Sequence, residues 1–190
     1  AQTGAVVGPS FDDPMIIAGQ GTGGLEIASQ AKELGERLDH LICCTGGGGL
    51  ISGIALALEK TSPQTKVWTA EPEGHEDWQR SLETGQVQTN APGTRSACDA
   101  ILTPSPGKLT WAVGGSRLAG GCVVSDEHAF EAMRIAFRQL RIVIEPGGAV
   151  ALASALFRLP EAAKGKTVGV ILTGGNVDPR LFAKVLNRSV

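Results

Sequence analysis

The sequence has little of what a membrane protein, a nucleic-acid binder or a zinc protein requires. Its 190 residues contain no apolar run near the ~20 residues of a membrane span, and no basic segment followed by an apolar one. The net charge of −2 favours neither nucleic acid nor an anionic membrane as a partner. The three histidines are scattered and the four cysteines form no Cys-x-x-Cys pair, so no zinc site is predicted. The cysteines are interpreted as small buried side chains in a reducing compartment, the cytoplasm.

Two common phosphate-binding motifs are also absent. A P-loop needs Lys followed by Ser or Thr after its closing glycine, but Ile54-Ala55 follow Gly53. The dinucleotide fingerprint needs glycines at its first, third and sixth places, and here Ile51 or Ser52 occupies the sixth. A nucleotide-binding Rossmann domain is therefore disfavoured.

A run of four glycines from Gly46 to Gly49 is the strongest signal that is present. Residues 40–44 before it predict a buried strand, and periodic apolar positions after it predict a helix over 50–60. Glycines let the backbone turn tightly and approach an anion. The N–H groups at a helix start point at such an anion, with the positive end of the helix dipole behind them. The loop is therefore predicted to bind a phosphate group, although a glycine turn that only allows close packing remains an alternative.

Five motifs occur in an order that resembles one enzyme family. They are Ile17–Thr22, the glycine run, Ala70–Pro72, Glu145–Ala149 and Leu172–Asp178. Together they resemble the C-terminal half of fold-type II pyridoxal-phosphate (PLP) enzymes, in the threonine dehydratase, serine dehydratase and serine racemase family. The resemblance runs from about Val6 to the C-terminal region, and thus covers nearly the whole chain.

The chain alternates strands with helices, which predicts an α/β fold. Nearly all strands are apolar, as in a parallel sheet covered by helices on both faces. The resemblance implies the Rossmann-like half of the tryptophan-synthase-β-like PLP fold. Besides 40–44 and 50–60, the expected strands are 5–7, 66–70, 122–124 and 167–172, and the expected helices are 14–35, 75–82, 126–140, 147–157 and 179–186, with an irregular stretch at 83–107. Because ligands lie at the carboxyl ends of parallel strands, the glycine run, Glu71 and the turn after Thr173 should converge.

The resemblance implies how the chain would hold PLP. The N–H groups of the glycine run would bind the phosphate, and the Thr173 hydroxyl would hydrogen-bond the pyridine nitrogen, where many relatives carry Ser or Cys. A hydroxyl does not hold a proton on that nitrogen, which suits β-elimination. A glutamate at position 145 would lie beside the ring. The predicted cofactor-binding residues are Gly46, Gly47, Gly48, Gly49, Leu50, Glu145 and Thr173.

The resemblance also implies a cation site. In several relatives two carboxylates with the spacing of Glu71 and Asp77, together with the backbone carbonyl at the position of His75, hold Mg²⁺ or Ca²⁺. Oxygen ligands are those that hard divalent cations prefer. A solvated acidic helix start is the equally open alternative.

The family's Schiff-base lysine lies in an N-terminal Ser-Phe-Lys-type motif that this sequence does not contain. Residues 1–190 are therefore expected to be the C-terminal part of a large PLP-binding domain, a fragment inactive alone, and the start at Ala1 is typical of a trimmed piece. The resemblance implies an ammonia-lyase that removes the β-hydroxyl of threonine or serine, giving a 2-oxo acid and ammonia. The alternatives are a serine racemase, a 3-hydroxyaspartate dehydratase, or a catalytically inert PLP- or phosphate-binding module. A small hydroxy amino acid is the expected substrate, and relatives are homo-oligomers.

Overall fold

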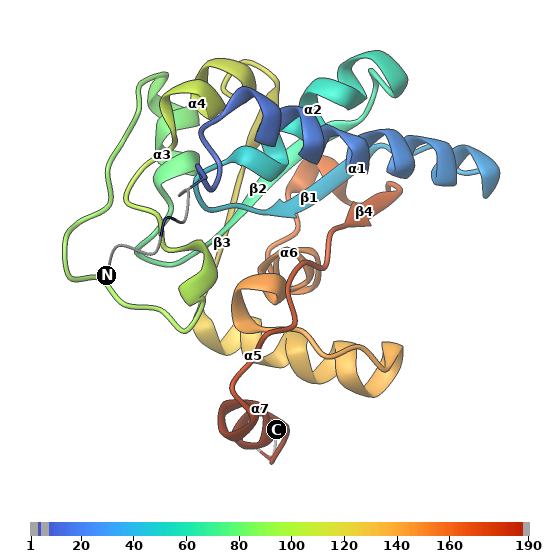
Figure 1. Ribbon diagram of the computed structural model, residues 1–190. Coiled ribbons are helices and arrows are strands. Elements are labelled where there is room, and N and C mark those ends of the chain that lie inside the picture. Colours follow the sequence, from blue (N-terminus) through green and yellow to red (C-terminus); the bar gives the residue numbers. More distant parts are fainter. Residues whose placement is uncertain (1–3, 5–7, 188–190) are drawn as a thin grey trace.

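The computed structural model describes residue 4 and residues 8–187, so the strand expected at 5–7 lies outside the described residues. Its centre is a four-stranded sheet in the order β3-β2-β1-β4, in which every pairing is parallel (Figure 1). The strands are β1 (His40–Cys44), β2 (Lys66–Pro72), β3 (Leu118–Val124) and β4 (Val168–Val170). The parallel α/β fold predicted from the sequence is thus confirmed.

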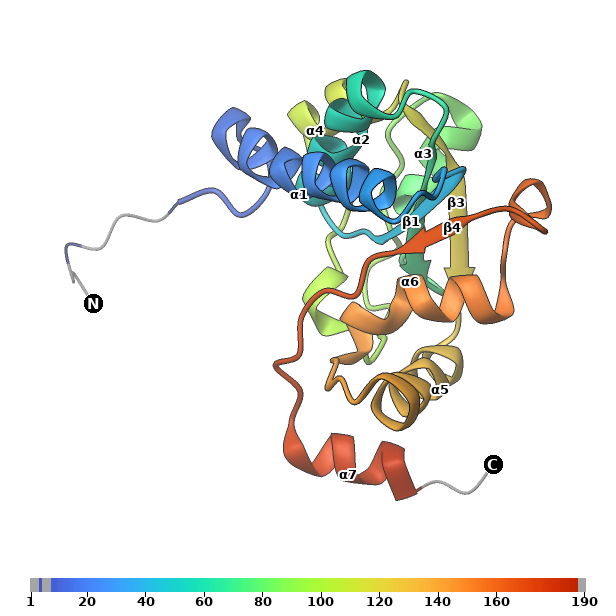
Figure 2. The ribbon, with the colours of Figure 1, turned by 90° about the vertical axis from the view of Figure 1, so that its right-hand side faces the viewer.

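Helices cover both faces of this sheet, as the apolar strands predicted. On one face lie α1 (Pro14–Glu33) and α2 (Gly49–Thr61), and on the other lie α5 (Asp126–Ile135) and α6 (Pro146–Phe157), as Figure 2 shows. Alternation along β1 explains the division, because Leu41 and Cys43 pack with α2 while Ile42 and Cys44 pack with α6. The last helix, α7 (Pro179–Asn187), packs against α5.

Two short helices border the sheet on the side of α2. They are α3 (Asp77–Thr84) and α4 (Lys108–Gly114), and between them runs an irregular segment with one 3₁₀ turn at Asp99–Ile101. The irregular stretch predicted at 83–107 is therefore largely correct, but α4 was not predicted. A second 3₁₀ turn covers Glu161–Ala163.

Several predicted boundaries differ from the structure. β3 starts at Leu118 rather than 122, because Ala-Gly-Gly at 119–121 hides the strand in the sequence. Helix α5 changes to a π-helical turn at Ala136–Leu140, which ends at Arg141 in the left-handed region (φ 61°). β4 is shorter than the predicted 167–172, although Ile171 N still donates to Ile42 O at 3.0 Å.

The strand order defines where a ligand can bind. From β1 the chain proceeds to β2 and β3 on one side, whereas β4 lies on the other side of β1, so β1 and β4 flank a topological switch point. In open α/β sheets, ligands bind at the carboxyl ends of strands at such a point. The glycine run follows β1 directly, and Thr173 comes three residues after β4.

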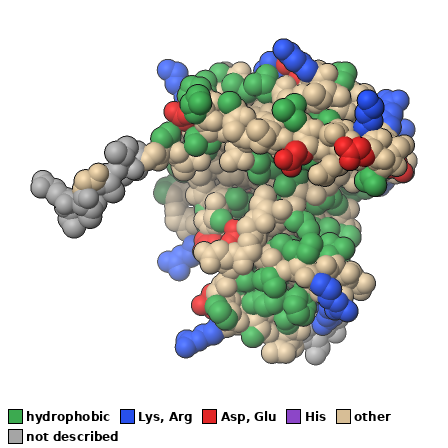
Figure 3. Space-filling view, turned by 45° about the vertical axis from the view of Figure 1, so that its right-hand side comes forward, with side chains coloured by type: hydrophobic (Ala, Val, Ile, Leu, Met, Phe, Trp, Pro, Cys, Tyr) green, Lys and Arg blue, Asp and Glu red, His purple; other side chains and the backbone are tan. Residues whose placement is uncertain are grey.

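The described surface has a mixed character. On the face shown in Figure 3, basic and acidic side chains are scattered among apolar and uncharged ones rather than gathered into one patch. Among the described helices, none combines the length and hydropathy that crossing a membrane would require.

Candidate active site

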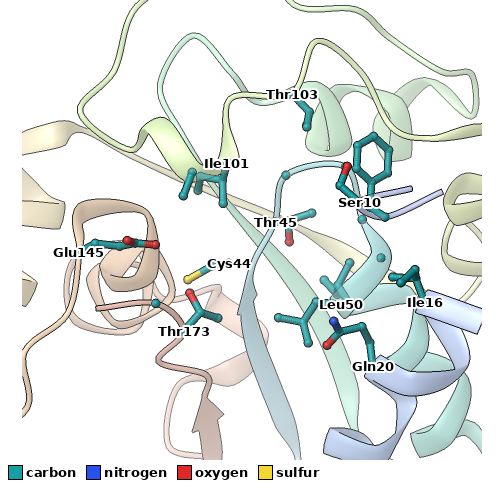
Figure 4. A pocket seen from close by; sticks show the side chains of 18 residues that line it. Ser10, Ile16, Gln20, Cys44, Thr45, Leu50, Ile101, Thr103, Glu145 and Thr173 are labelled. Carbon is teal, nitrogen blue, oxygen red and sulfur yellow. The ribbon is translucent and has the colours of Figure 1, made fainter. Parts of the chain in front are cut away.

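A cavity of about 380 Å³ lies at the switch point (Figure 4). The glycine run forms one wall, and Phe11 packs against it. Figure 4 shows Gln20 on the side of this wall and Glu145 and Thr173 across the cavity. All seven residues predicted to bind the cofactor line this cavity. The sequence prediction therefore placed together residues that are up to 127 positions apart, and the structure brings them to one opening.

The glycine run turns its carbonyl groups away from the cavity. Gly46 O accepts from Trp78 Nε1 at 2.8 Å, Gly47 O accepts from Thr110 Oγ1 at 2.7 Å, and Gly48 O accepts from the N–H of Ser52 at 3.0 Å. No group in the described part of the chain accepts a hydrogen bond from the N–H groups of Gly47, Gly48 or Gly49. The loop therefore offers free backbone donors at the start of α2, which is the arrangement that binds a phosphate.

Packing requires glycine at two positions of this run. Gly48 has φ +94°, in the left-handed region, and a Cβ there would overlap the ring of Trp78. A Cβ at Gly47 would overlap the ring of Phe11. Close packing against these two rings is compatible with phosphate binding, so it does not by itself favour the alternative interpretation of a glycine turn that only allows packing. The loop packs between the rings of Phe11 and Trp78, which restricts its backbone conformation.

The opposite wall contains three side chains that approach one another. Figure 4 shows the Cys44 thiol between Glu145 and Thr173. Thr173 lies beside the thiol, and burial raises the pKa of Cys44 to about 11, so the sulfur stays protonated at neutral pH. The thiol also lies 3.4 Å from Gly148 O and accepts from Ala151 N at 3.3 Å. This network of contacts attaches Thr173 to β1 and α6.

Glu145 is held at the start of α6. It is the N-cap residue of that helix, as its sequence position predicted, and its backbone N–H donates to Gly174 O at 3.0 Å. Its carboxylate lies against Gly174, where a Cβ would overlap it. The half-buried carboxylate therefore faces the cavity from a fixed backbone position.

The residues predicted to bind a cation lie outside this cavity. Glu71 is fully buried within β2 rather than after it, and its carboxylate accepts from the N–H groups of Trp78 and Gln79, both at 2.8 Å. Burial, followed by repulsion from Asp77, raises the pKa of Glu71 to about 8. Glu71 does not line the cavity, so its predicted convergence with the glycine run and Thr173 is wrong; Trp78, from whose backbone N–H it accepts, donates to Gly46 O.

Asp77 and His75 contain buried polar atoms without partners. Asp77 Oδ1 accepts from Asn90 Nδ2 at 2.6 Å, but Asp77 Oδ2 and both ring nitrogens of His75 have no hydrogen-bond partner among the described residues. Burial raises the pKa of Asp77 to about 6. Within the described residues, no group of three or more His, Cys, Asp or Glu side chains is arranged to hold a metal ion. The predicted cation site has only two such side chains, Glu71 and Asp77, and its third ligand is the backbone carbonyl of His75.

Sequence reasoning missed the residues that support the glycine run. Phe11 and Trp78 pack against it, and Thr110 and Trp78 hold its carbonyls. Asp12 in turn accepts from three backbone N–H groups at the start of α4. No spacing rule connects these positions, although Phe11-Asp12-Asp13-Pro14 does carry a helix-start signal, since Asp13 caps α1.

Comparison with known proteins identifies relatives of this arrangement. The sequence matches the family described as "Pyridoxal-phosphate dependent enzyme" over residues 1–174. It is 41% identical over 179 residues to the beta-hydroxyaspartate dehydratase of Paracoccus denitrificans. This alignment covers 94% of this chain and 54% of the relative. It is 38% identical to the serine racemase of Dictyostelium discoideum, covering 93% of this chain and 54% of that protein.

A solved structure has the same fold. Maize serine racemase superimposes with a TM-score of 0.85 at 34% sequence identity, over 96% of this chain and 55% of that structure. The chain spans about half the length of the relatives it matches.

Proposed function

Because the chain belongs to the family of pyridoxal-phosphate-dependent enzymes, we propose that it forms the phosphate- and ring-nitrogen-binding part of an ammonia-lyase. The enzyme would remove the β-hydroxyl of a small hydroxy amino acid and release a 2-oxo acid and ammonia. The observation that carries this proposal is the cavity with free N–H donors on one wall and the hydroxyl of Thr173 on the other.

The cavity fits PLP in its chemistry. The phosphate is an anion, and the loop presents unpaired N–H groups at the amino end of a 13-residue helix. The pyridine nitrogen accepts a hydrogen bond, and Thr173 supplies a hydroxyl donor on the other wall. Glycine at positions 47 and 48 lets the loop pack against Phe11 and Trp78, which keeps its backbone at the phosphate end.

The residues of this chain bind and orient the cofactor. When bound, PLP supplies the electron sink for the reaction at the substrate α-carbon. The loop N–H groups donate hydrogen bonds to the phosphate, and Thr173 orients the ring through its nitrogen without keeping a proton there. The protonated thiol of Cys44 adds no negative charge beside the ring. These features favour elimination over chemistry that needs a long-lived carbanion.

The amine partner of PLP comes from outside these 190 residues in this proposal. Seven lysines are present, and none of them lines the cavity, all seven lying within the described part of the chain. Residues 1–190 would then be the C-terminal part of a larger PLP-binding domain, inactive without the remainder. The short coverage of the relatives supports this assignment. The four free, buried cysteines support a reducing compartment such as the cytoplasm, and a homo-oligomer is proposed from the family.

An activity panel tests the proposal. The complete protein, meaning the full-length chain that contains these residues, is assayed with L-threonine, L-serine and L-threo-3-hydroxyaspartate for 2-oxo acid release, and with L-serine for D-serine formation. Release of 2-oxo acid from at least one substrate is expected. Racemisation without elimination would favour the racemase alternative, and PLP binding without any turnover would favour an inert binding module.

We also propose that Glu71, Asp77 and the backbone carbonyl of His75 bind Mg²⁺ or Ca²⁺. Two buried carboxylates with raised pKa values and one unpartnered carboxylate oxygen, Asp77 Oδ2, support this proposal. A divalent cation would relieve both the burial cost and the repulsion between the carboxylates. Glu71 is the weaker candidate because both of its oxygens already accept hydrogen bonds.

Adding Mg²⁺ or Ca²⁺ is expected to raise the Tm of the complete protein, by more at pH 8 than at pH 6. Protons compete with the cation, and Glu71 and Asp77 lose theirs between about pH 6 and 8. Without a cation the sign is opposite: the raised pKa of Glu71 means that the folded state binds its proton more tightly, so stability falls as pH rises from about 4.5 to 8. Saturation at 100-fold above Kd would add about 2.7 kcal/mol.

Thermal unfolding with matched variants checks this prediction. Asp77→Asn should abolish the cation effect. Asp178→Asn, which removes one charge but keeps a capping oxygen at the start of α7, far from α3 in Figure 1, should preserve it. An equal rise of Tm in the Asp77→Asn protein would contradict the site.

A further inference from the structure

We propose that Asp12 and Thr110 are positioning residues for the cofactor phosphate, because they hold the Gly47 carbonyl so that the next N–H points into the cavity. The inference rests on the proposed function and extends it to two residues that do not touch the cofactor. Its basis is a continuous set of hydrogen bonds from the segment before α1, through α4, to the glycine run.

The first step in this set is Asp12. Its Oδ1 accepts from the N–H groups of Leu109 at 2.7 Å and Thr110 at 3.0 Å, and its Oδ2 accepts from Lys108 N at 3.1 Å. These are three of the four N–H groups that a helix start leaves unpaired. Gly107 allows the approach, because a Cβ there would overlap the carboxylate. Asp12 thereby fixes the orientation of α4.

The second step runs from α4 to the loop. The fully buried Thr110 donates its hydroxyl proton to Gly47 O at 2.7 Å, and Gly107 N points at the same oxygen from 3.3 Å. Ser52 Oγ on α2 donates to Thr110 O at 2.9 Å, which ties α4 to the helix that the glycine run begins. Thr110 is thus held from both sides and can act as a fixed donor.

The geometry of the peptide unit links the hydrogen bond at Gly47 O to the direction of the next N–H group. In a trans peptide unit the C=O of one residue and the N–H of the next are coplanar and point in opposite directions. The described residues contain no cis peptide. Holding Gly47 O toward α4 therefore directs Gly48 N–H away from α4, toward the cavity. Trp78 acts in the same way on Gly46 O and the N–H of Gly47.

The adjacent Phe11 strengthens the coupling. Its backbone and ring lie against Gly47 and Gly49, so the segment preceding α1 packs on the loop beside the cavity. Asp12 anchors this segment to α4. The loop is thus held between two elements that are far from it in sequence.

The test compares two ligands that differ only in phosphate. Pyridoxamine 5′-phosphate and pyridoxamine are titrated calorimetrically into the apo form of the complete protein, since neither needs a lysine partner. Thr110→Val, which keeps the side-chain volume, is expected to lower the affinity for pyridoxamine 5′-phosphate about tenfold and to leave the affinity for pyridoxamine unchanged. Asp12→Asn should lower the affinity for the phosphorylated ligand severalfold. Thr110→Ser keeps the hydroxyl, so its affinity for pyridoxamine 5′-phosphate should stay within about twofold of wild type.

Asp13→Asn is the matched control. Asp13 also caps a helix, accepting from Met15 N at 2.8 Å, but it belongs to α1 and contacts neither α4 nor the glycine run. The variant removes the charge but keeps a capping oxygen, so it should leave stability nearly unchanged and should not change the preference for the phosphorylated ligand. The inference is overturned if Thr110→Val leaves that preference intact, or if Asp13→Asn reduces it equally. If wild-type protein binds neither ligand, the proposed function itself fails.

Discussion

Replacing Gly48 by alanine is expected to weaken binding of pyridoxamine 5′-phosphate to the complete protein by at least about 100-fold. An L-residue in the left-handed region at φ +94° costs roughly 1–2 kcal/mol. The new methyl group would also overlap the Trp78 ring, so the loop or the indole must move. Either movement breaks the hydrogen bond from Trp78 Nε1 to Gly46 O and misdirects the loop N–H groups.

Gly35→Ala separates the two causes. Gly35 ends the turn after α1 with φ +72°, and a Cβ there would meet no atom within 4 Å. This variant carries similar backbone strain without the overlap, and it lies outside the cavity. We expect a stability loss of about 1 kcal/mol and unchanged ligand affinity. Wild-type affinity in the Gly48→Ala protein would show that the loop does not hold the phosphate.

Replacing Thr173 by valine is expected to lower the elimination rate of the complete protein about 10- to 150-fold. Valine matches threonine in shape but cannot donate a hydrogen bond to the ring nitrogen. Hydrogen bonds to groups that gain charge contribute about 1.5–3 kcal/mol, and the ring nitrogen gains negative charge as the substrate reacts. The phosphate end of the cavity is untouched, so affinity for pyridoxamine 5′-phosphate should fall only a few-fold.

Steady-state kinetics of three proteins check this expectation. Thr173→Ser keeps the hydroxyl and should retain a rate within about threefold of wild type. Cys44→Ala tests the thiol that lies beside Thr173, and should give an intermediate rate. If the Thr173→Val enzyme has the same elimination rate as the Thr173→Ser enzyme, the hydroxyl has no role in the reaction.

The sequence predicted the parallel fold and the two walls of the cavity because both depend on local signals. The apolar strand at 40–44, the glycines after it and the helix start at Glu145 are each visible within a few residues. The alternation of strands with helices predicts a parallel sheet, and the carboxyl ends of parallel strands lie at one edge, so the loops that follow them come together.

The supporting residues could not be predicted, because their contacts cross long stretches of sequence. Thr110 is 63 positions from Gly47, and Asp12 is 96 to 98 positions from the N–H groups it accepts from. Helix α4, with only seven residues, has too few turns for a clear apolar period. Its place is determined by tertiary hydrogen bonds.

The placement of Glu71 shows a second limit of sequence reasoning. Its position next to Pro72 suggested a residue beyond the strand, accessible to a ligand. In the structure β2 continues through Pro72, and Val123 of β3 pairs with Glu71. The side chain is buried beneath α3 and accepts hydrogen bonds from its first turn. Pairing with Val123 and Val124 of β3 extends β2 through Pro72, and which strands pair cannot be read from the local sequence.

Amide NMR of the complete protein tests most directly whether this cavity holds PLP. Labelling threonine carbonyls with ¹³C and glycine nitrogens with ¹⁵N selects glycines that follow threonine, and this chain has five such pairs. Adding PLP should shift the signals of Gly46, at the phosphate end, and Gly174, at the ring end, while those of Gly23 and Gly85 stay in place. Saturation with PLP that leaves Gly46 and Gly174 unshifted would contradict the account.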